Sequence, residues 1–125
     1  MKKIQSIFDL KLPEKHRAYL EEFLEKVAQL SERDRIEKLV LFGSCARGDA
    51  SEKSDIDIAA IGESIDDELL WKLYDCMPAY APEKYVENDI IAITNKQYNE
   101  NIHSFGMVQK YIEREGIDLI GLLSS

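Results

Sequence analysis

Three short apolar segments constrain the fold of this chain more than any other feature, because each is typical of a buried strand. They cover residues 39–42, 56–61 and 86–93, and runs of this length favour strands over helices. Apolar residues recur at helical spacing in the segments 13–30 and 66–77. Strands that alternate with helices predict an α/β (α+β) fold, in which a small mixed sheet is flanked by helices.

Proline, glycine and helical periodicity indicate where the elements begin and end. The first helix is expected from Pro13 to a point near residues 31–35. Residues 95–116 indicate one helix or two, with Ser104 as a candidate cap. Residues 117–120 then form a last short strand or a docked tail.

The charge balance disfavours several classes of partner. The chain holds 24 acidic and 16 basic residues, which gives a formal net charge of −8. A field of this sign disfavours direct binding to nucleic acids and anionic membranes. No apolar run approaches the roughly 18 residues that span a bilayer, and the first residues lack the apolar core of a signal peptide. We expect one domain over residues 1–125, with its core at about 13–120.

The cysteines and histidines show no metal-site or disulfide pattern. Cys45 and Cys76 are too few for the disulfide framework of a small secreted protein. We expect both to be free thiols in a reducing cytoplasm. His16 and His103 are far apart and lack ligand spacing, so we expect surface or capping roles for them.

Two carboxylates interrupt the second apolar segment. Asp55 and Asp57 are two positions apart, so on a strand they lie on the same face. Two close acids beside a core repel each other unless one is protonated or a cation lies between them. Oxygen ligands at this spacing suit Mg²⁺ or Mn²⁺. The alternative is a strand end with two solvated acids.

A third acid accompanies the last apolar segment. Asp89 precedes four apolar residues, and it completes a three-carboxylate cluster if its strand lies beside the second one. Glu87 has the same parity and is the rival for this place. The alternative is that Asp89 belongs to a turn together with Asn88.

The loop after the first apolar segment has the composition of a phosphate site. Gly43 ends that segment and Ser44 follows it, so backbone N–H groups face a ligand at the start of a helix. Arg47 adds a forked cation for phosphate oxygens, and Gly48 lets the chain turn away. The alternative is an ordinary strand–turn–helix junction in which Ser44 caps the helix.

The two parts together resemble the signature of the DNA polymerase β-like nucleotidyltransferase superfamily. That signature is Gly-Ser, about ten residues, and then Asp-x-Asp; here residues 43–58 read GSCARGDASEKSDIDI, and ten residues separate Ser44 from Asp55. The Ala-Arg-Gly and Ser-Asp-Ile-Asp runs are most similar to the minimal nucleotidyltransferases of bacteria and archaea. The resemblance covers about residues 13–120 and is sharpest over 39–61.

The resemblance implies a role for each residue of the signature. Asp55 and Asp57 would hold two divalent ions, Mg²⁺ or Mn²⁺, and Asp89 would share one ion and help to remove the proton of the attacking hydroxyl. Gly43 and Ser44 would hold the phosphates of ATP, and Arg47 would add positive charge there. The implied reaction is in-line attack on the α-phosphorus, with pyrophosphate as the leaving group.

The minimal members also imply a protein partner. They resemble the antitoxin of a toxin–antitoxin pair, in which the partner is a helical HEPN-type RNase toxin. The antitoxin would silence the toxin by attaching AMP to one of its tyrosines. The alternatives are a non-catalytic, nucleotide-binding antitoxin that acts by binding, and a small-molecule nucleotidyltransferase. Both a homodimer and a hetero-oligomer are compatible with this resemblance.

Overall fold

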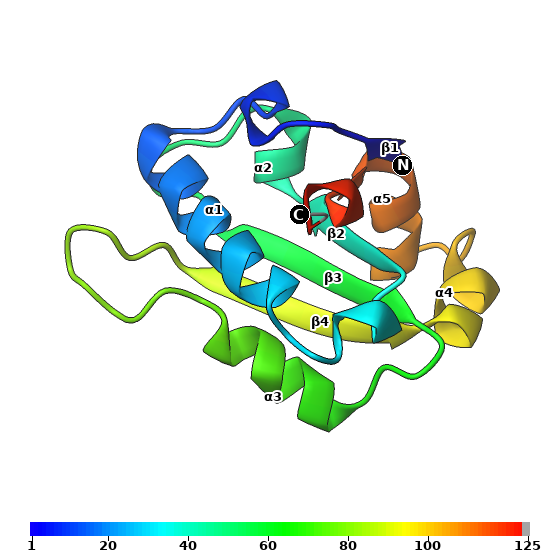
Figure 1. Cartoon of the computed structure of the whole chain (residues 1–125). Coiled ribbons are helices and arrows are strands. Elements are labelled where there is room, and N and C mark those ends of the chain that lie inside the picture. Colours follow the sequence, from blue (N-terminus) through cyan, green and yellow to red (C-terminus); the bar gives the residue numbers. More distant parts are fainter. Residues whose placement is uncertain (124–125) are drawn as a thin grey trace.

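A five-stranded mixed sheet forms the centre of the structure, a computed structural model that describes residues 1–123 (Figure 1). The strand order is β1-β5-β2-β3-β4. β3 and β4 are parallel, whereas β2 is antiparallel to both β3 and β5. The strands are β1 (Lys2–Lys3), β2 (Lys38–Phe42), β3 (Ile56–Gly62), β4 (Asn88–Thr94) and β5 (Ile117–Asp118). The mixed sheet of the predicted α/β (α+β) fold is confirmed.

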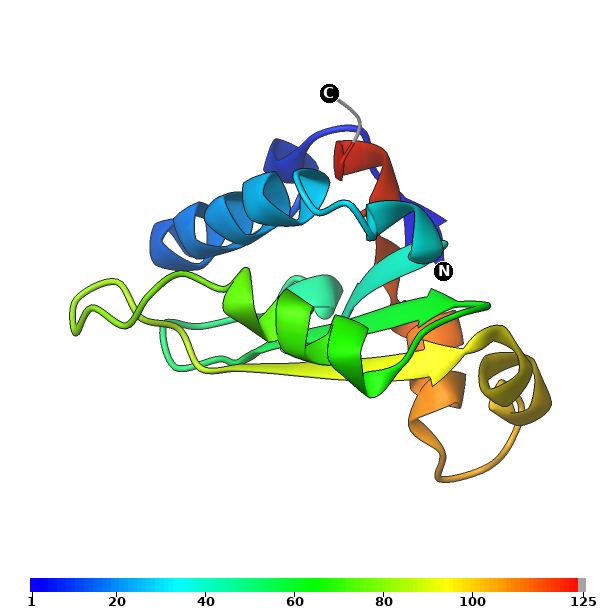
Figure 2. The ribbon, with the colours of Figure 1, turned by 60° about the horizontal axis from the view of Figure 1, so that its bottom comes forward.

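Within residues 1–123, five α-helices and three short 3₁₀ turns surround this sheet. The helices are α1 (Glu14–Ala28), α2 (Ser44–Arg47), α3 (Asp67–Asp75), α4 (Asn95–Asn101) and α5 (Val108–Glu115). The 3₁₀ turns are η1 (Ile7–Asp9), η2 (Arg33–Arg35) and η3 (Ile120–Leu123). Figure 2 shows α1 and α5 on opposite sides of the sheet. No helix within residues 1–123 is long and apolar enough to cross a membrane.

The two faces of the sheet bury separate apolar clusters because side chains alternate along each strand. We call one face the α1 face; its strand residues include Leu39, Leu41 and Ile58, which pack with residues of α1 and α3. The other is the α5 face; Val40 and Ala59 there pack with residues of α4 and α5. Burial on both sides explains why these strands read as continuous apolar runs.

Local contacts explain where element boundaries differ from the prediction. The first helix begins at Glu14, directly after Pro13, but ends at Ala28, before the expected range. The Arg33 guanidinium donates to the Ala28 carbonyl at 2.9 Å, which satisfies a backbone group that the last helical turn leaves open. The strand expected from residue 86 begins at Asn88.

The last third of the chain forms two helices rather than one. Gly106 has a φ of +82° between them, a conformation that interrupts a helix and favours glycine. Ser104 caps neither helix; Met107 holds the N-cap position of α5 without a side-chain hydrogen bond. Residues 117–118 form a short strand, β5, which pairs with β2 and with the unpredicted β1.

Candidate active site

The sheet register brings the predicted carboxylates to one end of β3 and β4. Asp57 faces Asp89 across this parallel pair, and Asp55 directly precedes β3. Asp57 shares parity with Ala59, so it lies on the α5 face. Burial raises the pKa of Asp57, and the charges of Asp55 and Asp89 raise it further. The charges of Asp55 and Asp89 therefore both act on the half-buried carboxylate of Asp57.

The register distinguishes Asp89 from its rival. Asp89 lies inside β4, so the interpretation that it belongs to a turn is wrong. Glu87 precedes the strand, and its backbone carbonyl accepts from the N–H of Ile56 at 2.9 Å. Burial raises the pKa of Tyr19 to about 12, and the charge of Glu87 adds to this rise. The geometry thus pairs Asp89, rather than Glu87, with Asp57.

Tyr74 of α3 contacts Asp89, and sequence analysis did not identify it. The Tyr74 hydroxyl lies 3.1 Å from Asp89 Oδ1. It also lies 2.9 Å from the backbone nitrogen of Ile90 and 3.1 Å from the carbonyl oxygen of that residue. No short motif relates a helical tyrosine to an acid fifteen residues later, so only the packing of α3 on β4 reveals this contact.

The Gly43–Ser44 junction lies against the carboxylates. Gly43 has a φ of +77°, in the region that favours glycine, and α2 begins at Ser44. A Cβ atom at Gly43 would lie 2.6 Å from Asp57 Oδ2. A side chain at this position would collide with the carboxylate, so glycine is required both for the backbone conformation and for the close approach.

Arg47 lies near the acids, but other carboxylates already bind it. Its Nη1 lies 3.1 Å from Glu115 Oε2 at the end of α5, and its Nε lies 3.6 Å from Asp49 Oδ2. The positive charge of Arg47 nevertheless partly counteracts the rise in the pKa of Asp57. A phosphate bound by Arg47 would therefore compete with Glu115 and Asp49.

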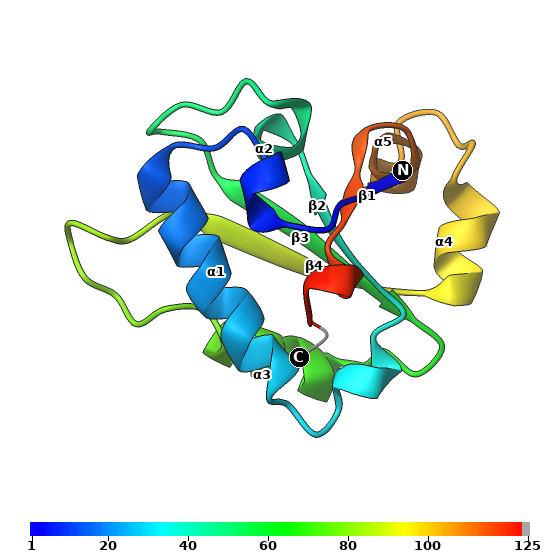
Figure 3. The same ribbon diagram turned by 45° about the horizontal axis from the view of Figure 1, so that its top comes forward.

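The loop before Asp55 is fixed by a buried histidine. His16 is fully buried, so the expected surface or capping role is wrong. Its Nε2 donates to the carbonyl of Ser54 at 2.7 Å, a partner that makes burial of the ring tolerable. Figure 3 shows the start of α1 beside the loop that follows α2. The second contact comes from Cys45, whose thiol donates to the Asp55 carbonyl at 3.3 Å.

Cys45 is a structural thiol rather than a nucleophile. Burial raises its pKa to about 11, and the nearby charges of Asp57 and Asp55 act in the same direction. Cys45 and Cys76 are both free, as expected, and both are buried. A thiol that stays protonated at neutral pH is a poor nucleophile.

The donor set fits a divalent cation of the Mg²⁺ type. Carboxylate oxygens are the ligands that Mg²⁺ prefers, and it binds through one or two carboxylates together with water and substrate phosphates. Within residues 1–123, no three His, Cys, Asp or Glu side chains converge closely enough to hold a metal ion by themselves. Asp55, Asp57 and Asp89 would thus supply part of a coordination shell rather than all of it.

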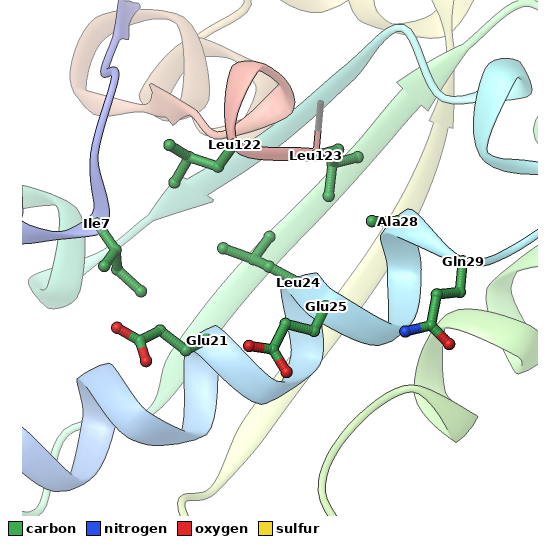
Figure 4. A pocket seen from close by; sticks show the side chains of 8 residues that line it. All are labelled: Ile7, Glu21, Leu24, Glu25, Ala28, Gln29, Leu122 and Leu123. Atoms are coloured by element: carbon green, nitrogen blue, oxygen red, sulfur yellow. The ribbon is translucent and has the colours of Figure 1, made fainter. Parts of the chain in front are cut away.

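A well-formed pocket lies elsewhere in the molecule. Its volume is about 470 Å³, and it lies between α1 and η3 (Figure 4). Its wall combines apolar side chains with Glu21, Glu25 and Gln29 from α1. None of the predicted site residues lines it, and it offers no cation for a phosphate. We therefore base the candidate site on the carboxylates and the Gly43–Ser44 junction, not on this pocket.

Residues 20–119 match the family described as "Nucleotidyltransferase domain". A curated relative from Methanocaldococcus jannaschii, named "Putative protein adenylyltransferase", is 61% identical over 31 residues. That match covers 25% of this chain and only 31% of the relative.

One similar solved structure comes from Sulfolobus solfataricus and is described as a "putative nucleotidyltransferase". Its TM-score is 0.49 and its sequence identity 24%, over 69% of this chain and 75% of that one. The family match, by contrast, spans most of the chain and includes β2, β3, β4 and all six predicted site residues. On that ground, the chain belongs to the nucleotidyltransferase domain family.

Proposed function

We propose that this protein transfers AMP from ATP to a hydroxyl group of a partner protein. The observation that carries the proposal is the register of β3 and β4, which pairs Asp57 with Asp89, while Asp55 directly precedes β3. The name of the M. jannaschii relative supports the choice of a protein as acceptor. The acceptor in this proposal is a tyrosine of a helical HEPN-type toxin.

In this reaction the carboxylates bind cations and remove one proton. Asp55, Asp57 and Asp89 would hold divalent cations, Mg²⁺ or Mn²⁺, which would neutralise negative charge on the entering and leaving oxygens. The acceptor oxygen forms a bond to the α-phosphorus, and the bond from that phosphorus to the bridging oxygen of the β-phosphate breaks. Pyrophosphate leaves, and Asp89 takes the proton of the acceptor hydroxyl.

The loop residues orient the triphosphate. The absence of a side chain at Gly43 lets the nucleotide approach Asp57 closely, and Ser44 supplies a hydroxyl and a backbone N–H. Arg47 binds phosphate oxygens after it exchanges its partners Glu115 and Asp49. Positioning and charge neutralisation together lower the barrier to transfer.

Exposed apolar side chains support a protein as the acceptor. Phe105 is 91% exposed, and three more large apolar residues at the start of α5 are at least 36% exposed: Met107, Val108 and Tyr111. Apolar residues gathered on a surface are typical of a protein interface. Glu115, which binds Arg47, is on the same helix as Tyr111, so α5 connects this surface to Arg47 of the candidate site.

A label-transfer experiment tests the proposal. The protein is incubated with α-labelled ATP and Mg²⁺, alone and with the protein that its neighbouring gene encodes. We expect label on the neighbour, and none with the double variant Asp55→Asn, Asp57→Asn. If the protein is folded and co-purifies with this neighbour but the neighbour carries no label, the proposal is contradicted.

The ion pairs of Arg47 favour one alternative function. If Arg47 stays bound to Glu115 and Asp49, the protein neutralises its partner by binding alone. The variant Asp57→Asn separates the two functions: a binding antitoxin still neutralises the toxin, whereas an enzyme loses transfer yet still binds.

A further inference from the structure

The Tyr74 hydroxyl connects α3 to the third carboxylate. It lies 3.1 Å from Asp89 Oδ1, and it accepts from the N–H of Ile90 at 2.9 Å. Tyr74 is half-buried on α3, and its ring lies 6.3 Å from that of Trp71. The hydroxyl is therefore held at a defined point beside the edge of the sheet.

The donor and acceptor balance of this hydroxyl favours a bond to Asp89. A phenol has one proton, and the acceptors within reach are Asp89 Oδ1 and the Ile90 carbonyl, both at 3.1 Å. A hydrogen bond to an ionised carboxylate is roughly twice as strong as one to a neutral group.

The position of β4 explains why a side chain must supply this contact. β4 is the last strand of the sheet, so the backbone groups of Ile90 that face away from β3 have no strand partner. Tyr74 bonds both of these groups. The same hydroxyl thus fixes the backbone next to Asp89 and one oxygen of its carboxylate.

We propose that Tyr74 is a positioning residue for Asp89. Its hydroxyl holds Oδ1 and leaves Oδ2 free to bind a cation and to accept the proton of the attacking hydroxyl. This inference rests on the proposed function. Partners that hydrogen-bond to metal-binding carboxylates typically contribute about 10–100-fold to metal affinity or activity.

The test uses Tyr74→Phe in the full chain, since this change removes only the hydroxyl. Mn²⁺ affinity is measured without nucleotide, and AMP transfer is measured separately as kcat and KM. We expect Mn²⁺ affinity and kcat to fall roughly tenfold, with KM for ATP little changed. Tyr80→Phe is the matched control, because Tyr80 is 72% exposed and does not contact Asp89.

A double-mutant cycle distinguishes positioning from a purely structural role. If Tyr74 acts through Asp89, Tyr74→Phe has no further effect on Mn²⁺ affinity in the Asp89→Asn background. An equal loss in both backgrounds overturns the inference, because Tyr74 would then act through the Ile90 backbone. Circular dichroism and melting temperature establish that each variant is folded.

The two measurements also separate this inference from the proposed function. If Tyr74→Phe weakens Mn²⁺ binding while no variant transfers AMP, the positioning role stands and the proposed function fails. If transfer occurs but Tyr74→Phe leaves both Mn²⁺ affinity and kcat unchanged, the inference is wrong. A wild-type protein that binds no Mn²⁺ overturns the inference as well.

Discussion

The two faces of the central sheet differ in what they bury. On the α1 face, Leu39, Leu41 and Ile58 pack into one continuous apolar cluster with α1 and α3. On the α5 face, apolar packing covers only part of the strands, and Asp57 and Asp89 lie side by side where it ends. The α1 face thus contributes apolar packing along the strands, whereas the α5 face combines an apolar cluster with like charges that oppose folding.

The largest expected effect is loss of packing on the α1 face. Phe23 of α1 is fully buried, so Phe23→Ala should lower the free energy of unfolding by about 3–5 kcal/mol. Urea denaturation followed by circular dichroism measures this change. Phe8→Ala is the control, since Phe8 is 73% exposed and should cost far less. Equal losses would contradict the division of roles between core and surface.

The next effect is at the junction with the acids. Gly43→Ala introduces strain at a φ of +77° and places Cβ against Asp57 Oδ2. Gly48→Ala has similar strain, at a φ of +85°, but meets only Lys11 Cβ at 3.9 Å. We expect each to destabilise the protein by about 1–2 kcal/mol. Only Gly43→Ala should abolish AMP transfer, and loss of transfer in both would contradict a specific role for Gly43.

A smaller effect of opposite sign is expected at Asp57. Its pKa is raised in the folded protein, chiefly by burial, so the folded state binds this proton more tightly than the unfolded state does. Stability therefore falls as pH rises through that pKa. Without divalent cations at pH 7, Asp57→Asn removes this half-buried charge and should stabilise the protein by roughly 0.5–1 kcal/mol. The expected effect is small because solvent screens the charge.

The pH dependence checks this sign. The advantage of Asp57→Asn should vanish below the ordinary aspartate pKa of 3.8, where wild-type Asp57 is protonated. Melting curves between pH 3 and pH 7, in EDTA, measure the difference. Glu52→Gln is the control for loss of one exposed negative charge. A variant that is less stable than wild type at pH 7 would contradict the repulsion among the acids.

The smallest effect concerns Cys45, which packs in the cluster of the α1 face. Its pKa of about 11 means that roughly one thiol in a thousand is ionised at pH 8. We expect the native protein to react with a thiol reagent far more slowly than the denatured protein, which should expose two thiols. Rapid reaction of native Cys45 at pH 8 would show that the α1 face opens easily.

The sequence predicted local features of the site better than distant contacts. Asp57 lies on the predicted strand and Asp55 directly before it, and Gly43 directly follows another strand, as the local pattern indicated. The choice between Asp89 and Glu87 depends on the register of β3 with β4, which no local pattern determines.

Long-range packing also explains what sequence analysis missed or misjudged. His16 donates to a carbonyl 38 residues away, so its burial could not be read from its own helix. Tyr74 reaches Asp89 only because α3 packs along β4. β1 consists of two lysines, which are not typical strand residues, and it forms because β5 offers a parallel edge.

The parallel pairing of Asp57 with Asp89 sets the spacing of these two acids through the backbone. Facing residues on neighbouring strands are roughly 4.8 Å apart, a distance fixed by interstrand hydrogen bonds rather than by side-chain packing. A core substitution should therefore change the fraction of molecules that are folded without changing the turnover of each folded molecule. A protein of this kind can lose much of its stability before the spacing of these two carboxylates is altered. The core is therefore free to vary over evolution.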